Sequence, residues 1–69
     1  MTPSEKAEKL LNDYREKGFT VLQAYDDLDS KIYEMAWETL DSEELKLKQA
    51  YVIAITWIKK MRDEGRRTL

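Results

Sequence analysis

The side chains that could do chemistry in this chain are carboxylates, amines, guanidinium groups and hydroxyls, because its 69 residues include no histidine and no cysteine. Those two residue types supply most general bases, thiol nucleophiles and soft metal ligands in proteins. The serines have no nearby base in the sequence, and two of them stand where helix caps are expected. We therefore expect no catalytic residue, no metal-binding residue and no cofactor, and we do not expect an enzyme.

One run of acids has the residue types of a calcium-binding loop. Asp26, Asp27 and Asp29 lie close together, and an EF-hand loop counted from Asp27 would place Glu38 at its twelfth position. The same count places Ile32 where the loop needs a glycine, and the segment has the pattern of a continuous helix. We therefore expect these acids to form a solvated helix face and not a metal site.

The charges are unevenly divided along the sequence although the net charge is only −2. Residues 18–44 hold eight acids and one base, whereas residues 45–69 hold seven bases and two acids. Two interpretations are open. An acidic second helix could lie beside a basic third helix, or the molecule could be a dipole that pairs head to tail or binds a charged ligand at its C-terminal end.

Five bases near the C-terminus are the candidate anion-binding residues. They are Lys59, Lys60, Arg62, Arg66 and Arg67. Such a group could contact the phosphates of a nucleic acid or of a signalling nucleotide. Two acids interrupt the run, however, and cations in the last turn of a helix also complement the helix dipole without any ligand. Binding of nucleic acid or nucleotide is therefore the alternative hypothesis.

An uncharged stretch between Lys48 and Lys59 has the periodicity of a helix. Apolar residues recur there at the i, i+3, i+4, i+7 spacing that places a core-facing stripe on one side. Val52 lies nearly opposite this stripe, between two flanking isoleucines. The stripe consists of Leu47, Ala50, Tyr51, Ala54, Trp57, Ile58 and Met61.

This helix has more apolar surface than a single stripe requires. Either it is a wide wedge between two neighbouring helices, or its outer apolar residues touch a second chain. An off-axis aromatic stripe in the preceding segment either closes one end of the fold or forms an exposed patch of the kind found at binding hot spots. The candidate protein-binding residues are Val52, Ile53 and Ile55 in the first group and Tyr33, Trp37 and Leu40 in the second.

Three helices are expected to position these residues, over about residues 3–17, 21–40 and 42–64. N-cap signals precede all three segments, and glycines follow the first and the third as stop signals. Because the connections are short, we predict an all-α, antiparallel three-helix bundle that forms a single domain over residues 1–69. Residues 66–69 are expected to be a frayed tail.

The small size of the chain bears on its partners and its location. A domain of this length buries only about 60% of the surface that its unfolded chain exposes, so a homo-oligomer is expected. The N-terminus is polar and charged, unlike a signal peptide. The uncharged stretch is also far shorter than the ~20 residues that cross a bilayer. We expect a soluble, cytoplasmic protein that does not bind membranes.

Two segments resemble short uncharacterised helical proteins of bacteriophages and prophages. They are residues 1–11, MTPSEKAEKLL, and residues 48–55, KQAYVIAI. The resemblance implies a class of function, since small phage products tend to act by binding a host component, often as oligomers. Our leading hypothesis is therefore a non-enzymatic, phage- or mobile-element-encoded protein that binds a host protein and self-associates.

Overall fold

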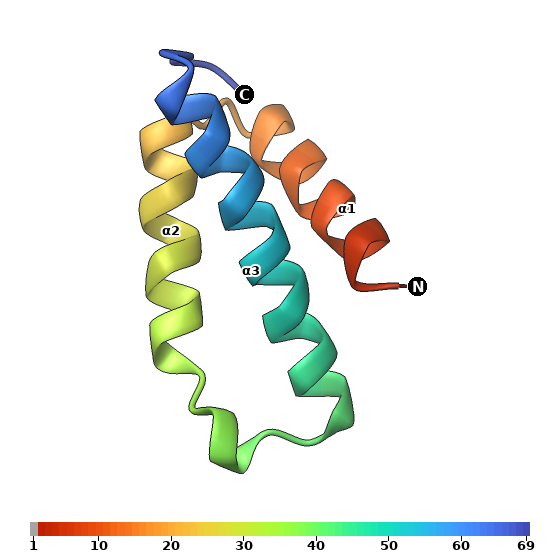
Figure 1. Cartoon of the computed structure of the whole chain (residues 1–69). Coiled ribbons are helices and arrows are strands. Elements are labelled where there is room, and N and C mark those ends of the chain that lie inside the picture. The colour runs from red at the N-terminus through yellow and green to blue at the C-terminus, as the bar shows by residue number, and fades with distance from the viewer. Residues whose placement is uncertain (1) are drawn as a thin grey trace.

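Three α-helices and one short 3-10 turn make up most of the protein (Figure 1). The computed structural model describes residues 2–69. The elements are α1 (Pro3–Glu16), α2 (Val21–Glu34), the 3-10 turn η1 (Trp37–Thr39) and α3 (Ser42–Asp63). α1 and α2 both pack against α3, and α2 runs antiparallel to the other two helices. The predicted all-α, antiparallel three-helix bundle is therefore confirmed.

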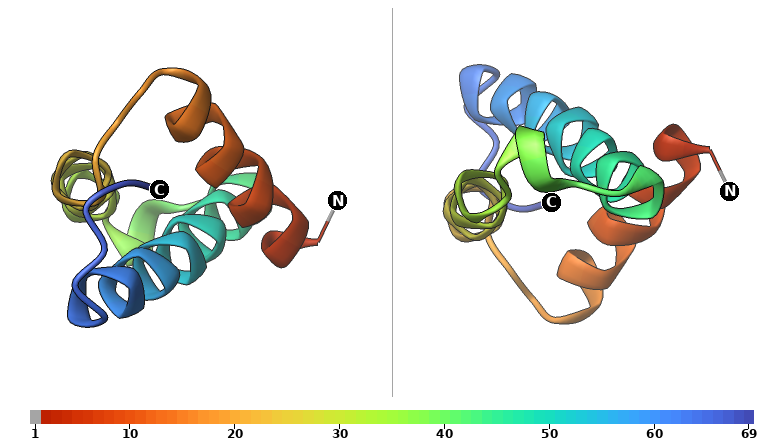
Figure 2. Two further views of the ribbon diagram at one scale, coloured as in Figure 1. Left: turned by 90° about the horizontal axis from the view of Figure 1, so that it is seen from above. Right: turned by 90° about the horizontal axis from the view of Figure 1, so that it is seen from below.

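The longest helix, α3, is also the one that the other two share. It has 22 residues, whereas α1 and α2 have 14 each. At a rise of about 1.5 Å per residue, each neighbour is about 12 Å shorter than α3. When the molecule is seen along its long axis, α2 appears almost end on, and α1 and α3 are inclined to it (Figure 2). Neither α1 nor α2 can therefore cover α3 along its whole length.

Helix starts are fixed by side-chain caps. Thr2, Thr20 and Asp41 each accept a hydrogen bond from the backbone N–H three residues further along. At Thr20 the contact is reciprocal, because the side chain of Gln23 accepts from the backbone N–H of Thr20 over 3.0 Å. A side-chain cap of this kind contributes about 1 kcal/mol, since it satisfies N–H groups that have no partner within the helix. The predicted N-cap signals are confirmed.

Glycines end α1 and α3, as predicted. Gly18 and Gly65 have φ angles of 76° and 80°, a left-handed conformation that other residues adopt only with strain. After each glycine, the next backbone N–H reaches back over 3.0 Å to a helix carbonyl, that of Tyr14 in α1 and of Met61 in α3. This pattern is the Schellman motif, which satisfies the last carbonyls of a helix.

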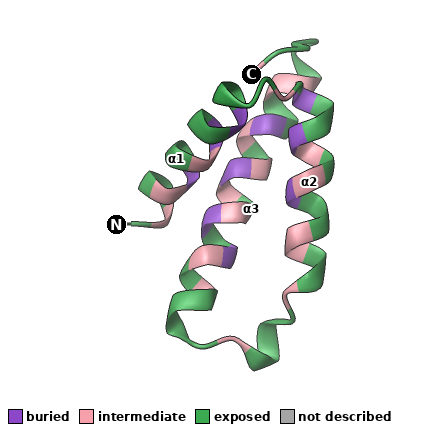
Figure 3. Cartoon of the chain, turned by 180° about the vertical axis from the view of Figure 1, so that it is seen from behind, coloured by how far each residue is buried: buried purple, intermediate pink, exposed green. Residues whose placement is uncertain are grey.

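The core lies where the apolar stripes of the three helices meet (Figure 3). The predicted stripe of α3 is confirmed at its centre, where Ala50, Ala54 and Ile58 are fully buried. Ile53 and Ile55 are half-buried and pack against this core. The neighbouring helices contribute Ala7, Leu11, Tyr14, Val21, Ala24 and Leu28. The alanines let the helix backbones approach closely, and the larger side chains fill the space between them.

The predicted helix over residues 21–40 is wrong at its C-terminal end. α2 ends at Glu34, and the next two residues are extended, with ψ angles of 102° and 130°. The chain then makes the single turn of η1. The break divides the expected aromatic stripe, because Tyr33 stays on α2 whereas Trp37 belongs to η1.

A buried lysine accounts for the place where α2 stops. Lys48 of α3 is 3% exposed, and its Nζ donates a hydrogen bond to the backbone carbonyl of Met35. In a continued helix that carbonyl would accept from the backbone N–H four residues further along. The Nζ also lies 4.1 Å from the centre of the Trp37 ring, a cation–π contact. Together these contacts hold η1 against the first turns of α3.

The C-terminal segment, residues 66–69, is not the frayed tail that we predict from the sequence. The backbone carbonyl of Arg67 accepts from the N–H of Val21 over 2.9 Å, and Thr68 forms an antiparallel bridge with Thr20. Leu69 packs against the core. The sequence prediction fails because the partner of this segment is the connection between α1 and α2, far away along the chain.

Replacing Lys48 by methionine tests its role in the break. Methionine keeps an apolar stem but cannot donate to the carbonyl of Met35, so we expect the free energy of unfolding to fall by about 1–3 kcal/mol. Amide hydrogen exchange should become faster in residues 35–41 than in the helices. Lys46→Met is the matched control, because Lys46 is exposed. Equal exchange in the two variants would contradict the role given to Lys48.

Candidate functional site

An apolar hollow lies on the side of α3 that carries Val52. It has a volume of about 300 Å³ and is lined by Pro3, Trp37, Gln49, Val52 and Ile53. Three elements contribute to it, namely the first residue of α1, the η1 turn and two successive turns of α3. Four of its five lining residues are apolar, and the fifth offers an uncharged amide. The hollow can therefore receive an apolar side chain and pair with one polar group.

The position of Val52 follows from helix geometry. It is two residues from Ala50 and two from Ala54, so it points about 160° away from both at about 100° per residue. Both alanines face the core, and Val52 is consequently 37% exposed. Trp37 is 55% exposed and reaches the same hollow because η1 is held by Lys48. The exposed apolar surface here depends on where α2 ends.

The structure brings together half of the predicted protein-binding residues. Trp37, Val52 and Ile53 line one hollow. The others lie elsewhere: Ile55 packs against the core, Leu40 is half-buried, and Tyr33 is 91% exposed on α2 outside the hollow.

Two of the residues that line the hollow beside Val52 are not predicted from the sequence. Gln49 is one helical turn from Val52 and Ile53, so the helix periodicity could have placed it on the same side. Pro3 carries no such signal, because its role as a helix-starting residue says nothing about what its ring contacts.

A second hollow, of about 440 Å³, follows the groove between α1 and α3. It is lined by Glu8, Leu11, Asn12, Arg15, Trp57 and Met61. Its one base is already engaged, because Arg15 donates to the side chain of Asn12 over 3.1 Å and to the backbone carbonyl of Leu69 over 3.2 Å. Arg15 of this groove therefore holds the C-terminal segment in place and is not free to bind a ligand.

The five candidate anion-binding residues do not line a single groove. Within α3, Lys59 and Lys60 point about 100° apart, and Arg62 points about 160° from Lys60. The guanidinium of Arg62 lies 4.7 Å from the ring of Tyr25, which further directs it toward α2. The remaining two, Arg66 and Arg67, are exposed in the C-terminal segment. The bases are therefore dispersed over this end of the molecule and do not form a built phosphate site.

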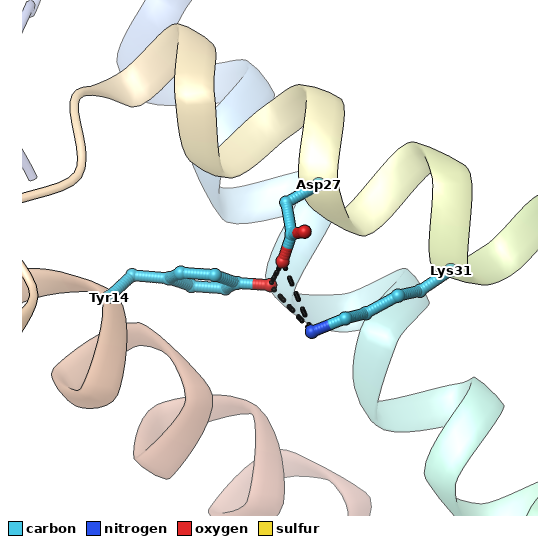
Figure 4. Close-up of polar contacts among 3 residues, drawn as sticks. All are labelled: Tyr14, Asp27 and Lys31. Atoms are coloured by element: carbon cyan, nitrogen blue, oxygen red, sulfur yellow. Dashed lines mark hydrogen bonds and ion pairs between the residues drawn. The ribbon is translucent and has the colours of Figure 1, made fainter.

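A polar cluster joins α1 to α2 (Figure 4). The hydroxyl of Tyr14 donates to Asp27 over 2.5 Å, and the ammonium of Lys31 lies 3.1 Å from the same carboxylate oxygen. Lys31 also donates to the Tyr14 hydroxyl over 3.4 Å and lies 5.8 Å from the ring centre of Tyr51. The sequence does not predict the cluster, because Tyr14 belongs to α1 whereas Asp27 and Lys31 belong to α2.

The environment of this cluster shifts three pKa values. Burial, and then the hydrogen bond to Asp27, raise the pKa of Tyr14 to about 12. The hydrogen bond from Tyr14 is the main reason that the pKa of Asp27 is lowered. Burial alone would lower the pKa of Lys31, but its contacts with Asp27 and Tyr14 outweigh burial and leave that pKa raised. The three shifts stabilise the neutral hydroxyl of Tyr14, the carboxylate of Asp27 and the ammonium of Lys31, which are the forms that contact one another. Such shifts indicate a structural contact rather than a general base.

Residues 2–69 contain no group of three or more acidic side chains placed to hold a metal ion. Over the same residues, every helix is too short or too polar to span a lipid bilayer.

Comparison of the chain with protein-family models, with curated proteins and with solved structures finds no match of any of the three kinds. The resemblance of residues 1–11 and 48–55 to bacteriophage proteins therefore stays a prediction from the sequence. The function has to be inferred from the surfaces described above, of which the hollow beside Val52 is the most apolar.

Replacing Tyr14 by phenylalanine should destabilise the protein by about 1–2 kcal/mol at pH 7, because a partly buried hydroxyl-to-carboxylate hydrogen bond is lost. The lowered pKa of Asp27 stabilises the fold above about pH 4, and this contribution disappears as the pH falls through the folded-state pKa. The raised pKa of Tyr14 stabilises the fold below about pH 10, and this contribution disappears as the pH rises toward 12.

The stability difference between the wild type and Tyr14→Phe should therefore be largest near neutral pH and smaller at both extremes. Urea denaturation at acidic, neutral and alkaline pH measures it. Tyr33→Phe is the matched control, because Tyr33 is 91% exposed and should give no difference at any pH. A difference for Tyr14→Phe that is independent of pH would contradict this account of the cluster.

Proposed function

We propose that this protein is a non-enzymatic helical module that binds another protein through the hollow beside Val52. The observation that carries the proposal is that Trp37 and Val52 remain exposed at 55% and 37% while lining an apolar hollow together. Tryptophan is one of the residues that are enriched at binding hot spots. The bundle gains nothing from leaving this apolar surface in water.

The shape of the hollow favours a protein partner over a small molecule. Its lining comes from α1, η1 and an outward face of α3, so the hollow is an open depression and not an enclosed cavity. Small-molecule sites usually bury most of the ligand surface. An open apolar hollow with one amide can instead accommodate a side chain of another folded protein, such as an apolar residue on a helix.

The resemblance to bacteriophage proteins supports a host protein as the partner class. On that basis we propose a phage- or mobile-element-encoded, cytoplasmic protein that acts by occupying a host surface. Nucleic acid or a signalling nucleotide is a weaker candidate, because the bases of α3 diverge around the helix axis and one of them stacks on Tyr25.

Site-specific photo-crosslinking in living cells tests the binding surface. A photoreactive residue at Val52 should give a discrete crosslinked product that mass spectrometry identifies as a protein. The same residue at Leu22 is the matched control, since Leu22 is 61% exposed but lies on α2. Trp37→Ala should reduce the Val52 product at least about tenfold, as expected for a hot-spot aromatic. Tyr33→Ala should leave it unchanged.

Two outcomes would contradict the proposal. One is a set of products that is the same at Val52 and at Leu22, because that would mean collisions rather than binding. The other is a Val52 product that persists in Trp37→Ala while circular dichroism shows that the variant is folded.

A further inference from the structure

We propose that the occupant of the hollow face is a second copy of this chain, paired antiparallel across a two-fold axis that passes beside Val52. The inference rests on the proposed function, because it names the partner of the same surface. It is argued from the spacing of the outward residues of α3, from the charges at the two ends of the molecule and from the groups that would meet at the axis.

The outward side of α3 carries a heptad-like seam. Leu45, Gln49, Val52, Thr56 and Lys59 follow one another at intervals of four, three, four and three residues. A mean interval of 3.5 residues keeps one line of side chains facing a partner helix along its whole length. Four of the five are exposed, and Leu45 is half-buried. The seam passes directly along the hollow, since Gln49 and Val52 belong to both.

Charge decides the partner and its direction. Residues 34–44, at the η1 end, hold five acids and no base, and Lys46 of the same end is paired with Glu43. Residues 59–67, at the opposite end, hold five bases and two acids, and Asp26 of α2 follows the Tyr25 ring that Arg62 contacts. The two groups lie toward opposite ends of a molecule whose longest dimension is 35 Å. A parallel pair would place acids against acids, whereas an antiparallel pair places each acidic end against the basic end of the other copy. An antiparallel pair therefore brings these oppositely charged segments together, and a parallel pair does not.

The groups near the axis also match. With the axis beside Val52, the two copies of Val52 meet each other, and Gln49 of one copy faces Thr56 of the other. The Thr56 hydroxyl donates to the backbone carbonyl of Val52 in its own helix over 2.8 Å. Its oxygen is then left as an acceptor for the side-chain amide N–H of Gln49 from the other copy. Leu45 of one copy would pack against the aliphatic part of the Lys59 side chain of the other copy.

Pairing in this way would close both hollows at once, because an isologous contact uses the same patch on each copy. Each copy would cover the exposed parts of Trp37 and Val52 of the other. The ends of the interface would be ionic and solvated, and its centre would be apolar. Such an interface loses affinity as salt is added, since only the ionic part is screened.

Sedimentation equilibrium of the full chain tests the proposal. At about 0.01 M salt, where the Debye length is about 30 Å, the protein at high micromolar concentration should be a dimer. At about 1 M salt, where it is about 3 Å, the dissociation constant should be at least about tenfold larger. Val52→Glu and Val52→Lys should each be folded monomers, because each places two like charges at the axis. An equimolar mixture of the two variants should recover the dimer.

The orientation can be read from disulfides, because the natural chain has no cysteine. Mixing Gln49→Cys with Thr56→Cys should give predominantly the mixed disulfide under mild oxidation. A parallel pair would instead give the two symmetric disulfides, since equal positions would face each other. Leu22→Glu is the control for association, because it adds a charge on α2 away from the seam.

Three results would overturn the inference. They are a monomer at low salt, a dimer that survives in both Val52 variants, and a predominance of symmetric disulfides. These results leave the proposed function standing if photo-crosslinking at Val52 captures a different protein. If the crosslinked product is this chain itself, the inference and the binding surface both hold, but a host protein at this hollow is ruled out. If there is no specific product and no dimer, both proposals fail.

Discussion

The hydrogen bond from Lys48 to the carbonyl of Met35 is the contact on which one whole end of the molecule depends. Burying an ammonium group costs several kcal/mol unless it finds oxygen acceptors or an aromatic face. The chain meets this demand by ending α2 at Glu34, which frees a backbone carbonyl and brings Trp37 over the Nζ. The turn at η1, the exposure of Trp37 and the hollow beside Val52 are all consequences of satisfying one buried charge.

The opposite end of the bundle is held in a different way. There, α1 and α2 are joined by the hydrogen bond between Tyr14 and Asp27. The C-terminal segment contacts the start of α2 through its backbone and α1 through the side chain of Arg15. Both flanking helices otherwise pack mainly against α3. In a domain of this size the apolar core alone leaves little margin, so the polar contacts are what keep the flanking helices in register on α3.

What could be predicted from the sequence was either local or periodic. The capping threonines, the stop glycines and the core stripe of α3 were placed correctly because each depends on residues within a few positions of one another. The end of α2 could not be placed, because residues 35–40 contain no glycine or proline and the lysine that decides it is 13 residues away.

The candidate site shows the same division. Val52 was placed by helix periodicity alone, whereas Trp37 was grouped with Tyr33 on a helix that does not extend that far. The prediction of a frayed tail is wrong for a related reason, because no local sequence pattern indicates that Thr68 pairs with Thr20. Contacts between segments that are distant in the sequence leave no local pattern, and in this protein such contacts determine the shape of the surface.

The bridge between Thr20 and Thr68 also orders the events of folding during synthesis. A ribosome releases the chain from its N-terminus at about 5–20 residues per second. The turn between α1 and α2 therefore emerges early, but Thr68, which pairs with it, emerges only after the whole of α3. Until Thr68 emerges the turn lacks this bridge, so the contact that secures the α1–α2 connection is made after α3 is complete.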